Sequence, residues 1–316
     1  MIIGKSVDGR RQGAGRSTGR YTVPKASRRF ARSNTPLYDR GAAGWWWALS
    51  GGTRWALLLL GATITVLPFL WMLGTSFKPE SDVFGYPLRL QPSHPTLDNY
   101  QSIWQDLPFL RLVINSVVFA GGVTIVSVFF DSLAAFALAR LRFPGRRIAF
   151  YLVLATLMVP FQVTLIPLFQ LVFQIGWLNT YQGLIVPRAT SAFGIFLLRQ
   201  FFVTIPVELD EAAKVDGAST LYVYARIILP QARPALASLG VFYFMNNWND
   251  FLWPLVMTSD TDMRNLPAGL TLFAGQYVVE HGVLMAGAVI SLLPLAVAFA
   301  LAQRYFVSGI ATTGMK

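Results

Sequence analysis

Long apolar runs, separated by shorter polar segments, follow one another from residue 55 towards the end of the chain. A helix needs about 20 apolar residues to cross the roughly 30 Å hydrocarbon core of a bilayer, and we count six runs of that length. The alternation typical of membrane strands does not recur, so the spans are predicted to be helices. They cover residues 55–77, 112–138, 148–173, 183–202, 235–257 and 283–307. Prolines inside these spans predict kinks, at positions 68, 160, 167, 187, 254 and 294.

Composition fits a membrane protein whose excess positive charge lies at one end. Hydrophobic residues make up 54% of the chain, charged residues 13%, and the net charge is +11. The first 54 residues hold eleven Lys or Arg and two Asp. We expect this tail to be disordered, with contact to anionic lipid as the alternative. Because positive charge near span ends stays in the cytoplasm, the N-terminus is predicted to be cytoplasmic, and six spans return the C-terminus to that side.

The predicted organisation is therefore a cytoplasmic tail followed by one all-α integral membrane domain. The tail covers residues 1–54 and the six-helix transmembrane domain covers residues 55–316. External loops are expected at about 78–111 and 258–282, and a longer inner loop at about 203–234.

The inner loop contains a polar stretch, EAAKVDGASTLYVYARIILP, which predicts two short helices joined by a turn. Glu211 begins the first helix, and Asp216-Gly217 is expected to end it because glycine tolerates the left-handed conformation. Ser219 is a suitable N-cap for the second helix, which is expected to end at Leu229, before Pro230.

The pattern E-A-A-x-x-x-G-x9-I-x-L-P in this stretch resembles the signature loop of permease subunits in binding-protein-dependent ABC importers. Segments such as LPFLWMLGTSFKP, ALARLRFPGRR and NWNDFLWPL extend the resemblance over residues 55–316. They are similar to the smaller six-span permease subunit of maltose-type carbohydrate transporters. The long basic tail and the charged Asp131 depart from that pattern.

The resemblance implies a multi-pass subunit of the bacterial cytoplasmic membrane that pairs with a second, homologous permease subunit. It further implies an ATPase subunit dimer that receives the signature loop and an external solute-binding protein. The residues implied in ATPase coupling are Glu211, Ala212, Ala213, Asp216, Gly217, Leu221, Tyr222, Ile227, Leu229 and Pro230. The alternatives are an amphipathic loop resting on the bilayer surface, and a lipid-interface position for Tyr222 and Tyr224.

The chain itself is not expected to be an enzyme. It lacks the phosphate-binding pattern G-x-x-x-x-G-K-[ST], so ATP and its Mg²⁺ would be used by the partner ATPase. The absence of cysteine excludes thiolate chemistry and disulfides. His94 and His281 stand alone in predicted loops, so we expect no bound metal or cofactor.

Polar residues of the fifth span are candidates for a solute pathway. Asn246, Asn249 and Trp253 would share one face of a continuous helix, next to Asp250, and amides and indole rings suit sugar hydroxyl and C–H groups. Helix packing through interhelical hydrogen bonds is the alternative.

The second external loop is expected, from the resemblance, to reach towards the solute-binding protein, or else to serve as a lid. The residues implied in this contact are Leu266, Pro267, Gly269, Gln276 and Tyr277.

Two intramembrane charges leave a second function open. Asp131 and Arg188 are expected not to pair, since their depths differ by roughly 20 Å at 1.5 Å per residue. A proton-coupled secondary carrier using Asp131 or Asp250 is the alternative to an ATP-driven importer of a sugar or related solute.

Overall fold

The computed structural model describes residues 51–86, 91–273 and 279–313. These residues are mostly helical, and none of them belongs to a β-strand. Contacts within the chain divide it into two units, residues 1–63 and 64–316. The described part of the first unit is the beginning of one helix, and the second unit contains the remaining helices. The prediction of an all-α membrane protein is confirmed.

Two helices are long and apolar enough to cross a membrane without interruption, α2 (Gly51–Ser76) and α5 (Phe109–Arg140). They correspond to the first and second predicted spans. The sixth predicted span lies within α16 (His281–Thr313), which is apolar over His281–Val297.

The third predicted span is not one continuous helix. It consists of α6 (Arg146–Thr156) and α7 (Phe161–Gln174), which meet at an angle of 96°. Pro160 precedes α7 with extended backbone. Proline lacks an N–H group and disfavours the helical conformation of the residue before it, so the break falls where the sequence predicts a kink.

The fourth and fifth predicted spans are also interrupted. The fourth contains α8 (Tyr181–Ile185), the 3₁₀ turn η2 (Val186–Arg188) and α9 (Ala192–Thr204). The fifth contains α13 (Arg233–Trp248) and, after a break, α14 (Leu252–Met257). By length and composition the described residues contain up to five spans, besides the shorter apolar helix at the start of α16. That count adds to α2 and α5 three bent pairs of helices, which cover residues 146–174, 192–215 and 220–248.

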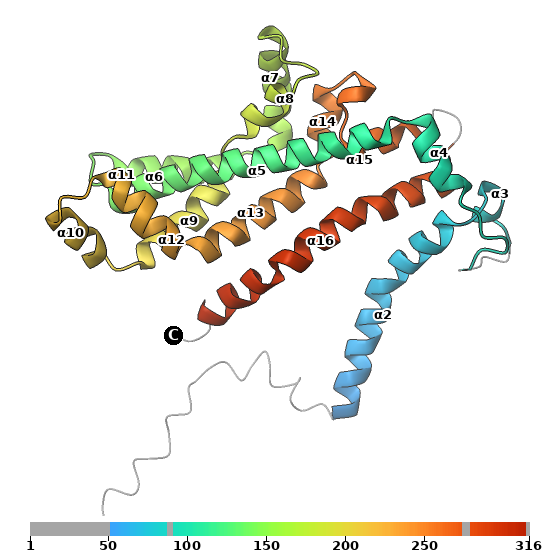
Figure 1. Cartoon of the computed structure of the whole chain (residues 1–316), viewed down its shortest axis with the longest axis horizontal. Coiled ribbons are helices and arrows are strands. Elements are labelled where there is room, and N and C mark those ends of the chain that lie inside the picture. The colour runs from blue at the N-terminus through green and yellow to red at the C-terminus, as the bar shows by residue number, and fades with distance from the viewer. Residues whose placement is uncertain (1–50, 87–90, 274–278, 314–316) are drawn as a thin grey trace, which may run out of the picture. The chain divides into compact units, whose positions relative to one another are not determined.

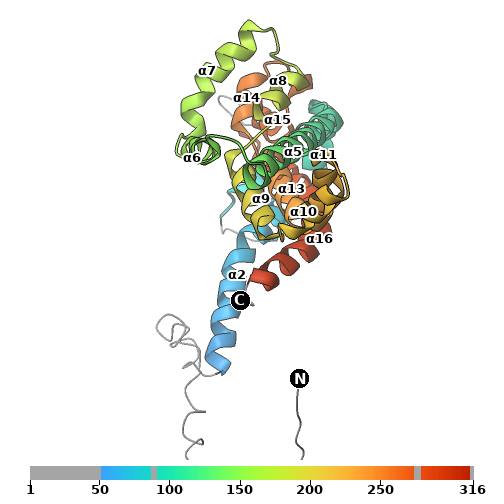
Figure 2. The same ribbon diagram turned by 90° about the vertical axis from the view of Figure 1, so that its left-hand side faces the viewer.

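The long helix α5 is the centre of the second unit. Helices α9 and α13 pack along it, and α16 packs against α13 (Figures 1 and 2). Buried apolar residues form one cluster near the C-terminal end of α5 and another near its N-terminal end. A third cluster joins α5 to α7, α8 and α14, which project from this group in both views.

Two short helices, α3 (Glu80–Val83) and α4 (Asp98–Asp106), lie in the first predicted external loop. The Glu80 carboxylate accepts hydrogen bonds from the His281 and Gly282 amides at 3.1 and 2.9 Å, at the start of α16. Burial tends to raise the pKa of Glu80, but these bonds and the His281 ring outweigh it and hold the pKa below its ordinary value. Glu80 therefore anchors the N-terminus of α16.

Candidate functional site

Residues 208–231 form the helix–turn–helix segment that the sequence predicts. Its first helix, α10 (Glu208–Val215), bends away from α9 by 75°. The second is a continuous helical stretch made of α11 (Thr220–Tyr222), the π-helical turn η3 (Val223–Ile228) and α12 (Leu229–Gln231). This stretch bends into α13 by 78°. Both helices therefore run across the direction of the spans that they connect.

Local chemistry sets the turn between the two helices. Gly217 has φ of +79°, in the left-handed region where glycine carries no Cβ penalty. The Ser219 hydroxyl accepts a hydrogen bond from the Tyr222 amide at 3.2 Å, which is an N-cap contact. The predicted stop and cap are thus confirmed, whereas the first helix begins at Glu208 rather than at Glu211.

The prediction that the second helix ends at Leu229 is wrong, because helical structure continues through Pro230 to Gln231. The π-helical turn directly before it is wider than an α-turn. In a regular α-helix the proline ring would meet the carbonyl group of Arg226. The wider turn relieves that clash.

The segment has one buried and one exposed face. Its buried residues include Asp210, Ala213, Val223, Tyr224 and Ile228. Its outer face exposes Glu211, Ala212, Val215, Asp216, Gly217, Leu221 and Tyr222. Of the other residues implied in coupling, Ile227, Leu229 and Pro230 are half-buried. The side chains of Val215 and Leu221 are 88% and 67% exposed, which is a large apolar exposure on so short a segment.

A buried ion pair ties this segment to the end of α5. Arg140 Nε lies 3.6 Å from Asp210 Oδ2, and the two side chains are only 7% and 8% exposed. Arg140 Nη2 also donates a hydrogen bond to the Ile205 carbonyl at 2.6 Å. No pattern in the sequence marks this pair, because Arg140 is one of several arginines on the inner side and Asp210 lies just outside the signature pattern.

A second contact joins the same elements. The Tyr224 hydroxyl hydrogen-bonds the Ser132 hydroxyl at 2.7 Å, and its ring packs against Phe136. Tyr224 is buried, so the alternative that places it at a lipid interface is wrong, whereas Tyr222 is 54% exposed.

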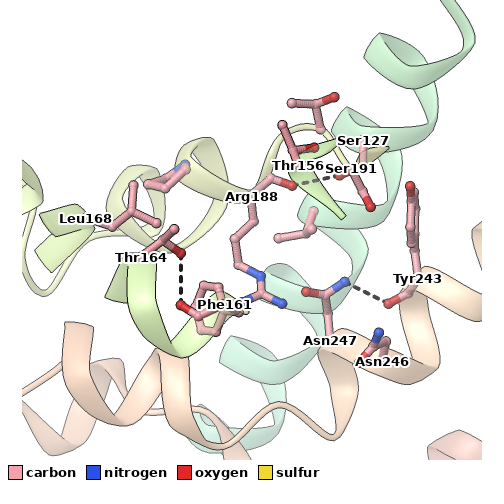
Figure 3. A pocket seen from close by; sticks show the side chains of 13 residues that line it. Ser127, Thr156, Phe161, Thr164, Leu168, Arg188, Ser191, Tyr243, Asn246 and Asn247 are labelled. Atoms are coloured by element: carbon pink, nitrogen blue, oxygen red, sulfur yellow. Dashed lines mark hydrogen bonds between the residues drawn. The ribbon is translucent and has the colours of Figure 1, made fainter. Parts of the chain in front are cut away.

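A polar cavity of about 540 Å³ lies between α5, α7, the turn at residues 186–191 and α13 (Figure 3). Eight of its thirteen lining residues carry hydroxyl or amide side chains, namely Ser127, Thr156, Thr164, Thr190, Ser191, Tyr243, Asn246 and Asn247. The Asn247 amide nitrogen donates to the Tyr243 carbonyl at 2.8 Å, while its buried Oδ1 has no hydrogen-bond partner. This oxygen is an unsatisfied acceptor inside the cavity wall, not one exposed to the cavity.

Asp131 lies behind the wall of this cavity and is fully buried. Its carboxylate accepts hydrogen bonds from the Thr190 hydroxyl at 2.6 Å, the Ser191 amide at 3.0 Å and the Tyr243 hydroxyl. Gly194 passes so close that a Cβ there would collide with Tyr243 and Asp131. Asp131, on α5, is thus joined both to α13 and to the turn before α9, through hydrogen-bond donors that stabilise a buried carboxylate.

Arg188 reaches the same cavity and pairs with Asp250. Arg188 Nη1 lies 3.1 Å from Asp250 Oδ2, and the guanidinium lies 4.9 Å from the centre of the Phe161 ring. Arg188 and Asp131 do not pair, as expected, but the predicted difference in depth is wrong. The interrupted fourth span brings Thr190 into contact with Asp131, and the Ser127 hydroxyl donates a hydrogen bond to the Arg188 carbonyl. Arg188 therefore lies beside the part of α5 that carries Asp131.

The fifth-span candidates do not share one helix face. Helix α13 ends at Trp248, so the helical spacing from Asn246 to Trp253 is lost. Asn246 lines the cavity, and Asn249 is exposed and donates to the carbonyl of Met245 at 2.8 Å. Trp253 is fully buried and donates to the Leu184 carbonyl at 3.0 Å. Trp253 is therefore a packing residue here.

The external-loop candidates lie in α15 (Leu266–Leu270) or beyond. Leu266 and Gly269 are buried, and a Cβ at Gly269 would collide with Leu112. The expectation that these two face a partner is wrong, because they pack against α5. Pro267 is half-buried, and Gln276 and Tyr277 lie outside the described residues. No group of three metal-ligating side chains occurs in the part of the chain that the structure describes.

Comparison with known proteins confirms the resemblance seen in the signature loop. Residues 131–312 match the family model described as "Binding-protein-dependent transport system inner membrane component". The arabinooligosaccharides transport system permease protein AraQ of Halalkalibacterium halodurans is 36% identical over 81% of this chain and 92% of its own length. The sn-glycerol-3-phosphate transport system permease protein UgpE of Escherichia coli is 34% identical over 80% and 93%.

The fold has a counterpart among solved structures. A chain of a bacterial ABC transporter involved in the import of the acidic polysaccharide alginate superposes with a TM-score of 0.72 at 24% identity. The match covers 86% of this chain and all of that one. Sequence and fold agree, and this chain belongs to the family of inner-membrane components of binding-protein-dependent transport systems.

Proposed function

We propose that this chain is one of two homologous permease subunits of an ATP-driven importer for a sugar or related solute. The energy comes from separate ATPase subunits that use ATP and Mg²⁺, and an external solute-binding protein delivers the solute. Relatives named for arabinooligosaccharides and for glycerol phosphate support a solute rich in hydroxyl groups.

The observation that carries this proposal is the two-faced helix–turn–helix segment. Its outer face offers an acidic group, Glu211, beside the exposed apolar side chains of Val215, Leu221 and Tyr222. On a cytoplasmic loop, such an apolar surface is more stable buried in a cleft of a soluble partner than exposed to water. Because its other face is held by Arg140 and Ser132 of α5, movement of the partner would displace α5 with it.

The polar cavity supplies this chain's share of the solute pathway. Its volume of about 540 Å³ falls within the roughly 300–1,000 Å³ typical of small-molecule sites. The exposed amide of Asn246 provides groups that bind hydroxyls, and Asp250 contributes by holding Arg188. Because α5 lines the cavity and also holds the helix–turn–helix segment, one rigid helix links the two sites.

The external loop supplies the surface for the solute-binding protein. Ser259, Asp260 and Asp262 are exposed there, beside the half-buried Pro267. The contact thus involves residues 259–262 rather than the buried Leu266 and Gly269.

Site-specific cross-linking tests the docking role, and the absence of native cysteine makes the chain suited to it. Val215→Cys and Leu221→Cys are expected to cross-link to the ATPase subunit in the assembled complex. Leu97→Cys is the matched control, because Leu97 is 66% exposed at the start of α4, near the opposite end of α5. Equal cross-linking of all three variants, or none with the first two, would overturn the docking role.

Reconstitution separates this proposal from the proton-coupled carrier. Asp131 accepts three hydrogen bonds and Asp250 is paired with Arg188, so both carboxylates already have partners. Liposomes that contain only this chain are expected to show no solute uptake under a pH gradient. Uptake by the isolated chain would refute the ATP-driven mechanism.

A further inference from the structure

The turn between α5 and α6 carries positive charge that no carboxylate among the described residues neutralises. Arg142, Arg146 and Arg147 line an open pocket of about 670 Å³, together with Phe143, Pro144, Gly145 and Ile148. No Asp or Glu occurs in the sequence between Asp131 and Glu208. None of the three arginines forms a salt bridge among the described residues, and Asp210 is engaged with Arg140.

The pocket lies at the cytoplasmic end of the spans. It directly follows Arg140, which holds the helix–turn–helix segment, and Figure 1 shows α6 and α11 at the same end of α5. The pocket is therefore at the level of the inner-leaflet headgroups. There the anionic lipids of a membrane attract clustered basic side chains.

An apolar stripe begins at the edge of this pocket. Ile148, Tyr151 and Leu152 lie on one face of α6, at i, i+3 and i+4, and are 65%, 66% and 63% exposed. The opposite face is covered, because Phe150 stacks on Phe196 and lies 3.9 Å beneath the Arg199 guanidinium. The stripe faces away from the helices of its own chain.

We propose that this pocket binds an anionic phospholipid of the inner leaflet. The phosphate is held by Arg142, Arg146 and Arg147, and an acyl chain runs along Ile148, Tyr151 and Leu152. Guanidinium groups bind phosphate through paired N–H donors, which suits this role. Arg146 is oriented by its hydrogen bond to the Leu141 carbonyl at 2.9 Å, whereas Arg142 and Arg147 are free to close over the headgroup. The inference concerns a different site from solute transport and does not depend on the transported solute.

Lipid binding to the assembled complex tests the proposal. The complex is placed in phosphatidylcholine nanodiscs with increasing fractions of phosphatidylglycerol, and retained phosphatidylglycerol is counted by native mass spectrometry. Arg142→Gln and Arg147→Gln are each expected to lower the apparent affinity about five-fold, equivalent to about 1 kcal/mol per basic residue at an anionic surface. The double variant is expected to lose about 25-fold on the same basis. Arg233→Gln is the matched control, because Arg233 is an exposed arginine at the start of α13 and does not line the pocket. It is expected to lower the affinity less than either pocket variant.

Three results would overturn the proposal. The first is equal retention of phosphatidylglycerol by the wild-type protein, the double variant and the control. The second is displacement of phosphatidylglycerol by inorganic phosphate alone, which would make the site a phosphate site. The third is loss of the ATPase subunit from the double variant, which would assign the arginines to an acidic protein surface instead.

Discussion

Replacing Asp210 by asparagine removes one charge of the buried pair that joins the helix–turn–helix segment to α5. At 3.6 Å and an effective dielectric constant of about 20, the attraction between the two charges is about 5 kcal/mol before desolvation is subtracted. Removing one member of a buried pair typically costs roughly 3–5 kcal/mol, because the other charge stays buried without compensation. Arg140 keeps its hydrogen bond to the Ile205 carbonyl. We therefore expect the lower end, about 3 kcal/mol, for Asp210→Asn.

A double-mutant cycle separates the ion pair from simple damage to the fold. Arg140→Gln/Asp210→Asn leaves no buried charge, so it is expected to be more stable than Asp210→Asn alone. Glu208→Gln, an exposed change at the start of the same helix, is the control and is expected to cost about 0.5 kcal/mol. The free energy of unfolding in mixed micelles gives the stability of each variant.

The functional readout is the amount of solute transported per ATP hydrolysed in reconstituted complexes. Because the pair links the ATPase-facing segment to the helix that lines the cavity, Asp210→Asn is expected to hydrolyse ATP with less transport. The reasoning is refuted if Asp210→Asn matches Glu208→Gln in both measurements. It is also refuted if the double variant loses the sum of the two single losses.

Three further predictions test other parts of the structure. Gly194→Ala would force a Cβ against Tyr243 and Asp131, and an overpacked core typically loses roughly 1–3 kcal/mol. Gly121→Ala, with open space at its Cβ, should not lower the free energy of unfolding in mixed micelles. Gly217→Ala strains a left-handed residue by about 1 kcal/mol and should lower the amount of solute transported per ATP. Gly176→Ala, at φ +71° in an outer turn, should lose similar stability without lowering transport per ATP. Because the pKa of Glu80 is lowered, its contact with α16 is complete above the ordinary pKa of glutamate and is lost as the pH falls through the lowered folded value. The hydrogen exchange rates of residues 281–285, corrected for intrinsic rates, should therefore rise in acid. Glu80→Gln should remove this pH dependence.

The features that the sequence predicts well are those set by neighbouring residues. Apolar runs identify the membrane segments, because the bilayer requires length and hydropathy that can be counted along the chain. Gly217 and Ser219 fix the turn of the helix–turn–helix segment through their own backbone preference and a hydrogen bond three residues away. Pro160 marks a kink, although its angle of 96° depends on what α6 and α7 pack against.

The positions of the intramembrane polar residues follow from tertiary contacts instead. A continuous fifth span would align Asn246 with Trp253, but the break after Trp248 turns Trp253 into the core. Arg188 forms an ion pair with Asp250, and Asp131 accepts a hydrogen bond from Thr190. Both contacts form because the interrupted fourth span places the turn at residues 186–191 beside α5.

By itself, the sequence determined the class of protein, its membrane segments and the shape of its signature loop. The tertiary structure decided which charges meet, where the cavity lies and which face of the loop is free. Local signals act over three or four residues, whereas the pairs Arg140–Asp210 and Ser132–Tyr224 join segments far apart in the chain. Such pairs form only when helix packing brings their partners within a few ångströms, and no pattern along the chain encodes that distance.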